Sequence, residues 1–521
     1  MLIKNCIIID GMQQPRYEAD IRIEKNLIHE IGNLHEHNNE RVINAQNNFV
    51  VPGFVDILNH SDVYLTLFSN AGQNSLVQQG ITTILMGNCG TSLAPLTNPG
   101  VIMMVQKWAD PSLLNVNWMS MGEYLAELDH HHLRINVGTL VGHSTLRRGI
   151  LGDSFREANS HEIKQMQFLL DNAMNEGAFG LSTGFAYSHA KIASASEIDA
   201  LLDVVKKYDG LYSAHLRDEG EHLIPAVEEA LDSASRNTVH LEISHFKAMG
   251  ETFWSNFSKA IDMITEARSQ GVFVNFDLYP YTTTLSVLYI FLPDWVAEGG
   301  KKKMLERIQD SVIRKRLVQE MRQDPHQYDR MVIASANLDP TFIGRTIKEI
   351  AKNQETSIED AVLNMLSASE GRVSVFTTTL SEANIMQAVQ NPYSFTSSDG
   401  IGYLHSDGKS GKLVHPRSFG AFPRYFSRYI QENNLLTWEQ AIYKATYGPA
   451  QKIGLKNRGK IEKGAYADIV IFNPKKIKDN ATFQNPYQYP SGINWVIVNG
   501  EVAVRDGKTT TNRAGEILRR E

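Results

Sequence analysis

Residues 211–245 read LYSAHLRDEGEHLIPAVEEALDSASRNTVHLEISH, and two apolar runs in this stretch each end in a histidine. Leu211–Ala214 is followed by His215, and Val239–Ser244 is followed by His245. Such runs recur about every 30 residues over 179–277, which is the length of one strand and one helix. The stretch therefore predicts a βα repeat in which histidines follow the strands.

Working outward, eight such runs occupy the middle of the chain and predict an α/β protein with a (β/α)8 TIM-type barrel. Two further runs, Met331–Ser335 and Val373–Phe376, also have the composition of strands, so the count of eight stays open. The eight runs are Phe54–Leu58, Ile81–Gly87, Ile135–Gly142, Phe179–Thr183, Leu211–Ala214, Val239–Ser244, Val272–Phe276 and Ser394–Ser398.

The two ends of the chain have a different pattern, with β-branched runs closed by Asp-Gly or Asn-Gly. These dipeptides are strong hairpin signals, so residues 1–50 and 455–521 are expected to form one small β-sandwich domain. The barrel then occupies 51–454. Within it, residues 290–350 do not fit one βα unit and are expected to form an inserted subdomain. The Lys/Arg-rich part of that segment is interrupted by acidic residues and indicates a solvated helix.

Composition excludes several classes of protein. The 521 residues are 42% hydrophobic and 21% charged, with a net charge of −7 and only two cysteines, Cys6 and Cys89. This balance offers no basic surface to nucleic acid, and the apolar runs are shorter than the ~18 residues of a membrane span. A disulfide scaffold is excluded. We expect a cytoplasmic protein that binds neither nucleic acid nor membranes; the oligomeric state is open.

Residues that can bind a metal or carry a proton follow seven of the eight runs. In a barrel the carboxyl ends of the strands meet on one face, which holds the active site. Thiolate and imidazole are zinc ligands, and a catalytic zinc takes three protein ligands plus an open position. Cys89, His215 and His245 would form such a set, and Asp399 could carry a proton of the attacking water. The seven residues are His60, Cys89, His143, His215, His245, Asp277 and Asp399.

A series of motifs, in order along nearly the whole chain, resembles the N-acyl-D-amino-acid deacylases (D-aminoacylases) of the amidohydrolase superfamily. Gly87-Asn88-Cys89-Gly90 separates this branch from relatives that hold metals with a carboxylated lysine. The other motifs are Val51–Asp56, Gly80–Thr83, Leu140–His143, Gly180–Gly184, His215–Glu219, Ile243–Lys247, Asp277–Tyr281, Ser398–Gly400, His415–Arg417 and Gly464–Asp468.

The resemblance implies a zinc-bearing barrel beside a small β domain, and zinc-dependent hydrolysis of N-acyl-D-amino acids to a carboxylate and a free D-amino acid. It implies Cys89, His215 and His245 as the tight zinc site and Asp399 as the catalytic acid and base. The residues that it implies for the substrate are Lys247, Tyr281 and Arg417, with Ser286 aligned more loosely. Outside their motifs, Lys247 and Arg417 would be interpreted as surface charges and Tyr281 as a core residue. His189 is expected to lie on the surface.

The chain departs from the family at one position. The first strand of the family ends in His-x-His, whose two histidines face a second, weaker metal site, but here the triplet is Leu58-Asn59-His60. Leucine cannot bind a metal, so one tightly bound zinc is expected and a second metal is doubtful. His60 and His143 are candidates for a second metal or for an oxyanion contact. Two alternatives stay open: an amidohydrolase for a cyclic amide or dipeptide-like substrate, and a catalytically silent relative.

Overall fold

Eight parallel strands form a closed barrel in the computed structural model, which describes residues 1–105, 108–323, 326–336 and 340–520. All eight predicted runs are barrel strands, and the predicted fold is confirmed. The barrel closes where Asn59 pairs with Gly400 in a parallel bridge. The strands are β6 (Phe54–Asp56), β7 (Ile81–Met86), β8 (Asn136–Thr139) continued by β9 (Val141–Gly142), β10 (Gly180–Gly184), β11 (Leu211–His215), β12 (His240–Ile243), β13 (Val274–Leu278) and β17 (Ser394–Thr396).

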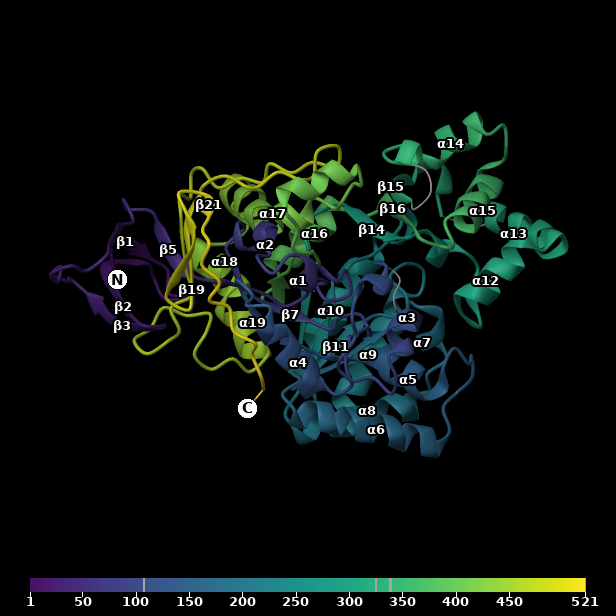
Figure 1. The fold of residues 1–521 in the computed structure, drawn as a ribbon, viewed down its shortest axis with the longest axis horizontal. Coiled ribbons are helices and arrows are strands. Elements are labelled where there is room, and N and C mark those ends of the chain that lie inside the picture. The colour runs from purple at the N-terminus through teal and green to yellow at the C-terminus, as the bar shows by residue number, and fades with distance from the viewer. Residues whose placement is uncertain (106–107, 324–325, 337–339, 521) are drawn as a thin grey trace.

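Helices surround the barrel, as α8 and α9 show beside β11 (Figure 1). The strands are buried on both faces, as parallel strands covered by helices must be, and α8 packs Leu201, Leu202 and Val205 toward them. Ser194 accepts a hydrogen bond from the Glu197 amide and so caps α8. The helices are α1 (Thr66–Ser69), α2 (Asn74–Val77), α3 (Gly100–Val105), α4 (Met121–His130), α5 (His143–Leu151), α6 (Ser160–Asn175), α7 (Ser188–Lys191), α8 (Ala195–Lys207), α9 (Leu223–Asn237), α10 (Asn256–Ser269), α16 (Glu382–Gln390), α17 (Arg417–Arg424), α18 (Trp438–Ala445) and α19 (Tyr447–Lys452).

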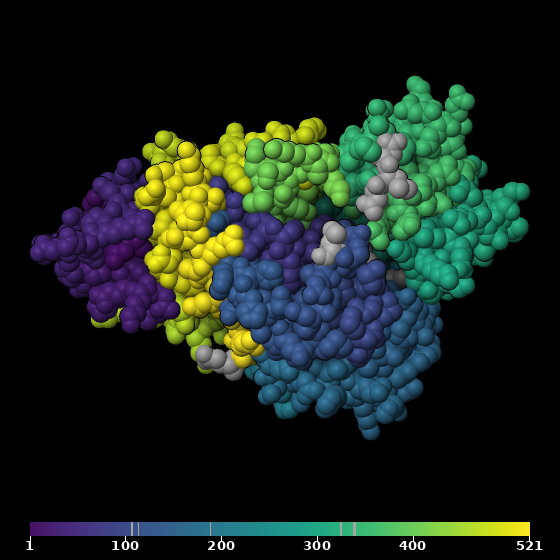
Figure 2. Space-filling view, in the orientation of Figure 1, coloured from purple at the N-terminus to yellow at the C-terminus, as the bar shows by residue number. Residues whose placement is uncertain are grey.

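Both chain ends build the small β domain, where the N-terminal and C-terminal segments lie side by side (Figures 1 and 2). Hydrogen bonds join its strands into one nine-stranded sheet around an isoleucine-rich core. The sheet folds back on itself: the Ile28 amide donates a hydrogen bond of 2.9 Å to the Ala465 carbonyl, and the Gly464 amide donates one of 2.8 Å to the Ile28 carbonyl. The strands are β1 (Leu2–Ile8), β2 (Tyr17–Glu24), β3 (Leu27–Gly32), β4 (Val42–Asn44), β5 (Phe49–Pro52), β18 (Ile469–Phe472), β19 (Ile493–Val498), β20 (Glu501–Arg505) and β21 (Lys508–Thr509).

A separate three-stranded antiparallel sheet, with its own hydrophobic core, lies between β13 and β17 in the sequence. It contains the two runs that left the strand count open, so its elements reach beyond residues 290–350. In the described part of the chain, no helix is both long and apolar enough to cross a membrane. The elements of this inserted subdomain are β14 (Thr283–Val287), β15 (Val332–Ala336), β16 (Val373–Thr378), α11 (Asp294–Ala297), α12 (Gly300–Gln309), α13 (Ser311–Gln323), α14 (Ile347–Asn353) and α15 (Ile358–Ala368).

Candidate metal centre

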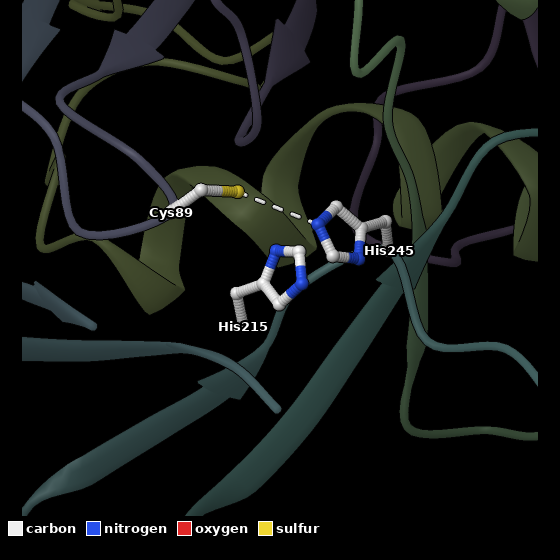
Figure 3. A group of neighbouring side chains, drawn as sticks. All are labelled: Cys89, His215 and His245. Atoms are coloured by element: carbon white, nitrogen blue, oxygen red, sulfur yellow. Dashed lines mark hydrogen bonds between the residues drawn. The ribbon is translucent and has the colours of Figure 1, made fainter. Parts of the chain in front are cut away.

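The ligand atoms of Cys89, His215 and His245 all lie within 4.8 Å of one another (Figure 3). Cys89 follows β7, His215 ends β11 and His245 follows β12, so three barrel strands deliver one residue each. Among the described residues, this is the one group of three such side chains at that separation. The three residues that the sequence suggested as zinc ligands are thus brought together at the carboxyl ends of the strands.

Each of the two histidines keeps a ring nitrogen that could bind a metal. The Nε2 atom of His245 lies 3.4 Å from the Cys89 sulfur, whereas its Nδ1 atom faces Glu219 at 3.1 Å. The Nδ1 atom of His215 is buried and has no hydrogen-bond partner within the described residues. One sulfur and two imidazole nitrogens match the three protein ligands of a catalytic zinc, so the residues present fit this metal.

The electrostatics of the group favour a thiolate. Burial opposes ionisation of Cys89, but the charge of His245 and hydrogen bonds from His215, His245 and His60 hold the Cys89 pKa well below its ordinary value. Thiolate is the form of cysteine that binds metals. Burial and Lys247 act against protonation of His245, yet Cys89 and Glu219 raise its pKa to about 10. Without a metal the group therefore holds a thiolate beside an imidazolium.

Asp399 lies at the seam that closes the barrel, where its amide donates to the Leu58 carbonyl at 3.0 Å. One carboxylate oxygen lies 2.9 Å from Nε2 of His60, and the other lies 2.6 Å from Nη1 of Arg417. Burial raises the pKa of a carboxyl group, but Arg417 and His60 outweigh burial here and hold the Asp399 pKa far below its usual range. Asp399 is therefore a carboxylate.

The backbone at three of these residues lies in the left-handed region that residues other than glycine seldom adopt. Its φ angle is +53° at Cys89, +36° at His245 and +46° at Asp399. Conformations of this kind cost about 1–3 kcal/mol each and gather at functional sites. Their presence at two members of the metal group and at Asp399 supports a functional origin for this geometry.

Glu219 is a residue of the site that the sequence reasoning did not assign. Its Oε1 atom lies 2.6 Å from Nζ of Lys247 and 3.1 Å from Nδ1 of His245. A metal-binding histidine commonly donates its second ring N–H to a carboxylate, which fixes the ring. The available signal was a carboxylate four residues after the candidate ligand His215, inside the quoted stretch.

The aromatic ring against Arg417 belongs to Tyr279. The guanidinium carbon of Arg417 lies 4.6 Å from that ring centroid, and the Arg417 amide donates to Nδ1 of His415 at 3.1 Å. Tyr281, the tyrosine proposed from the sequence, instead packs its ring under Arg424 at 4.7 Å. The sequence could not distinguish Tyr279 from Tyr281 as the partner of Arg417, since both lie in the same motif just after β13.

Of the other candidates, His60 lies beside the metal group, whereas His143 and Ser286 lie elsewhere. Nε2 of His143 is 2.7 Å from a carboxylate oxygen of Glu197 in α8, so the structure does not bring His143 into the metal group. Ser286 lies on β14 opposite Val375, in the inserted subdomain. His60 is 3.9 Å from the Cys89 sulfur.

The surface position expected for His189 is wrong, because this side chain is only 5% exposed. Its Nε2 atom lies 3.0 Å from the Gly152 carbonyl oxygen. His189 was expected to be exposed because it was assigned to a helix end or a loop. It is buried because α7, which carries it, packs against α5.

Comparison with known proteins identifies a family and several relatives of this chain. The profile of the amidohydrolase family matches residues 41–256 and 401–504. The chain is 31% identical to the N-acyl-D-glutamate deacylase of Alcaligenes xylosoxydans xylosoxydans, over all of this chain and 96% of that protein. It superimposes on the N-acyl-D-glutamate deacylase of Bordetella bronchiseptica, solved with zinc and a phosphonate inhibitor, with a TM-score of 0.82, 28% identity and 99% coverage of both chains.

A solved structure of D-aminoacylase gives a TM-score of 0.83 at 29% identity, covering 100% of this chain and 99% of that one. The family resemblance proposed from the motifs is confirmed by these matches, and the relatives named here match 99–100% of the chain. This chain belongs to the amidohydrolase family.

Proposed function

We propose that this protein is a zinc-dependent hydrolase that cleaves the amide bond of N-acyl-D-amino acids. One observation carries the proposal: a buried Cys-His-His group lies beside a carboxylate, Asp399, that is held ionised by Arg417. Full-length similarity to proteins named as N-acyl-D-glutamate deacylase and D-aminoacylase supports the choice of substrate class.

The sulfur of Cys89 and the ring nitrogens of His215 and His245 would hold the zinc ion. When bound, zinc supplies Lewis acidity, which polarises a carbonyl group and makes water a better nucleophile at neutral pH. The chain contributes the orientation of the ligands, since Glu219 accepts from Nδ1 of His245 and leaves Nε2 directed at Cys89.

Asp399 acts as the general base and then as the general acid. As a carboxylate it accepts a proton from the attacking water while the water oxygen bonds to the acyl carbon, and it then donates that proton to the leaving nitrogen. The carbon–nitrogen bond breaks, and the products are a carboxylate and a free amine. His60 lies 2.9 Å from Oδ1 of Asp399 and Arg417 lies 2.6 Å from Oδ2, so these two contacts fix the orientation of the carboxylate.

Lys247 and Arg417 supply positive charge for the α-carboxylate of the substrate. Arginine binds a carboxylate through parallel N–H groups, and Nη1 of Arg417 lies 2.6 Å from Asp399. Tyr279, under the Arg417 guanidinium, takes the place proposed from the sequence for Tyr281. With the α-carboxylate at one end and the acyl carbonyl at the other, the side chain of one enantiomer alone is accommodated.

One zinc per chain is proposed. Leu58 stands two residues before His60, at the position of the first histidine of the family's His-x-His, and leucine offers no lone pair to a second metal. The D-aminoacylase structure comes from a study of one-metal activation and second-metal attenuation in a binuclear centre. This supports catalysis by a single ion at the Cys-His-His group.

A substrate panel tests the proposal. Zinc-loaded protein is incubated with N-acetyl-D-amino acids of acidic, neutral and basic side chains, with their L enantiomers and with dihydropyrimidines. Hydrolysis of D substrates, with little on the L forms, is expected. Activity on the L forms or cyclic amides alone would overturn the assignment in favour of another amidohydrolase, and no activity with zinc bound would favour a silent relative.

A further inference from the structure

Among the three proposed zinc ligands, Cys89 lies furthest beyond its strand, in a loop three residues after the end of β7 (Figure 3). His215 is the last residue of β11, where the strand ladder with β10 holds it. His245 follows β12, and its amide donates to a carboxylate oxygen of Asp277 at 3.1 Å. The direction of the Cys89 sulfur therefore depends on what holds residues 87–92, here called the Cys89 loop.

The hydroxyl group of Ser182, a fully buried residue of β10, joins the two sides of the Cys89 loop. Its Oγ atom donates to the Gly87 carbonyl and accepts from the Gly90 amide at 3.0 Å. A hydroxyl group has one hydrogen to donate, so the direction of both bonds is fixed. One side chain thus connects the residues on either side of the Asn88-Cys89 pair.

The backbone of the Cys89 loop has a conformation that needs such support. The φ angles are +71° at Gly87, +53° at Cys89 and +76° at Gly90, all in the left-handed region. A Cβ atom at Gly90 would lie only 2.8 Å from the amide nitrogen of Gly184, so the loop meets β10 backbone to backbone. A strained conformation at a residue such as Cys89 persists only where surrounding contacts determine it.

A second hydroxyl group holds the far end of the Cys89 loop. Oγ1 of Thr145, in α5, accepts from the Ser92 amide at 2.9 Å and donates to the Ser92 carbonyl at 2.8 Å. The Ser144 amide donates to the Gly90 carbonyl at 2.8 Å. Because Thr145 contacts the loop three residues after Cys89, it acts on the sulfur less directly than Ser182 does.

We propose that Ser182 is a positioning residue of the metal centre, whose hydroxyl group holds the Cys89 loop so that the sulfur faces the two histidines. The inference rests on the proposed function and extends it to a residue outside the ligand set. Without the hydroxyl group, the Gly87 carbonyl and the Gly90 amide lose this partner where water does not reach them. The loop then relaxes, and the sulfur is no longer held in place for a metal.

Metal binding to Ser182→Ala tests this role without reference to hydrolysis. Cadmium is titrated into metal-free protein against a competing chelator, and the ultraviolet charge-transfer band between sulfur and cadmium is followed. The band reports on Cys89, because Cys6 lies in the core of the small β domain. We expect the dissociation constant for cadmium to rise roughly 10-fold or more, as for loss of other groups that orient a metal ligand. Zinc, measured by chelator competition, should show the same change.

Ser75→Ala is the matched control. Ser75 is also fully buried, and its Oγ atom makes the same kind of bridge, donating to the Ile401 carbonyl at 3.2 Å and accepting from the Tyr403 amide at 2.9 Å. That bridge holds a loop without a proposed zinc ligand. Ser75→Ala should therefore lower the thermal unfolding temperature but leave both metal affinities unchanged.

Thr145→Val, which keeps the shape of the side chain and loses both bonds to Ser92, should weaken metal binding by a smaller factor. It also serves if Ser182→Ala does not fold. Metal affinities equal to those of Ser75→Ala, in Ser182→Ala or in Thr145→Val used in its place, would overturn the role given to Ser182. A parent protein that binds neither metal would instead overturn the proposed function.

Discussion

Oε1 of Glu219 lies 2.6 Å from Nζ of Lys247, so a buried carboxylate joins a residue proposed for substrate binding to the metal group. The same oxygen is 3.1 Å from Nδ1 of His245, and Lys247 Nζ is 2.9 Å from that nitrogen. Glu219 therefore fixes the His245 ring and also sets the position of the Lys247 charge. We therefore expect both the metal affinity and the substrate affinity of the protein to depend on this one carboxylate.

Replacement of Glu219 by glutamine is expected to weaken zinc binding roughly 10–100-fold, the usual effect of removing a carboxylate behind a metal-binding histidine. KM for the D substrate should rise as well, because Lys247 loses its partner. Zinc competition with a chromophoric chelator measures the first effect. Glu221→Gln, at an exposed position two residues further along, is the matched control. Equal zinc affinity in both variants would refute the role given to Glu219.

The two cysteines should differ sharply in reactivity. Burial and the Asp20 charge raise the Cys6 pKa to about 12, whereas the Cys89 pKa is lowered. Because the thiolate is the reactive form, a disulfide reagent at pH 7 should modify one thiol per metal-free chain rapidly, and zinc should protect it. The fast phase should vanish in Cys89→Ser and persist in Cys6→Ser. A fast phase that survives in Cys89→Ser contradicts the assignment.

Asp399→Asn should abolish proton transfer while leaving the zinc ligands in place. Loss of a general acid and base lowers kcat by roughly 10²–10⁴-fold. Zinc content and kcat are measured on the same preparation, with Asp262→Asn on the exposed face of α10 as control. If Asp399→Asn hydrolyses the substrate at the parent rate, another group carries the proton.

Leu58→His restores the His-x-His pattern of the resembled family. We expect zinc content to rise from about one to about two ions per chain, because the introduced imidazole and that of His60 would have the spacing of the family's His-x-His. Leu58→Asn, which adds polarity with less ligating power, controls for the burial of a polar side chain at this fully buried position. Thermal unfolding is followed in both. An unchanged zinc content in a folded Leu58→His protein argues against a second metal position.

The barrel could be predicted from the sequence because each strand is a short apolar run followed by a polar residue. Phe54–Leu58 and Ser394–Ser398 illustrate this, although the pairing of Asn59 with Gly400 across the seam could not be read from either run. The inserted subdomain was harder, since its antiparallel strands have the same composition as barrel strands. Only the pairing of β14 with β16 places Thr283 and Thr378 together.

The metal group was predictable because ligand chemistry restricts which residues can serve. The residues around it were not predictable, because a charged side chain can pair with any of several neighbours. Arg417 illustrates this: Tyr279 and Tyr281 both follow β13, but Arg417 lies over the ring of Tyr279, and the ring of Tyr281 lies under Arg424. Glu219 is an ordinary charged residue in the sequence, and only its contacts with His245 and Lys247 identify it.

We propose that one zinc at Cys89, His215 and His245 supports hydrolysis of the D enantiomer. The most direct measurement is a zinc titration of metal-free protein, with the hydrolysis rates of N-acetyl-D- and N-acetyl-L-forms of one amino acid followed together. The D rate should rise in proportion to zinc and reach its plateau at about one ion per chain, while the L rate stays at the baseline. A D rate that needs no zinc or a second equivalent, or an equal rate on the L form, would contradict the account.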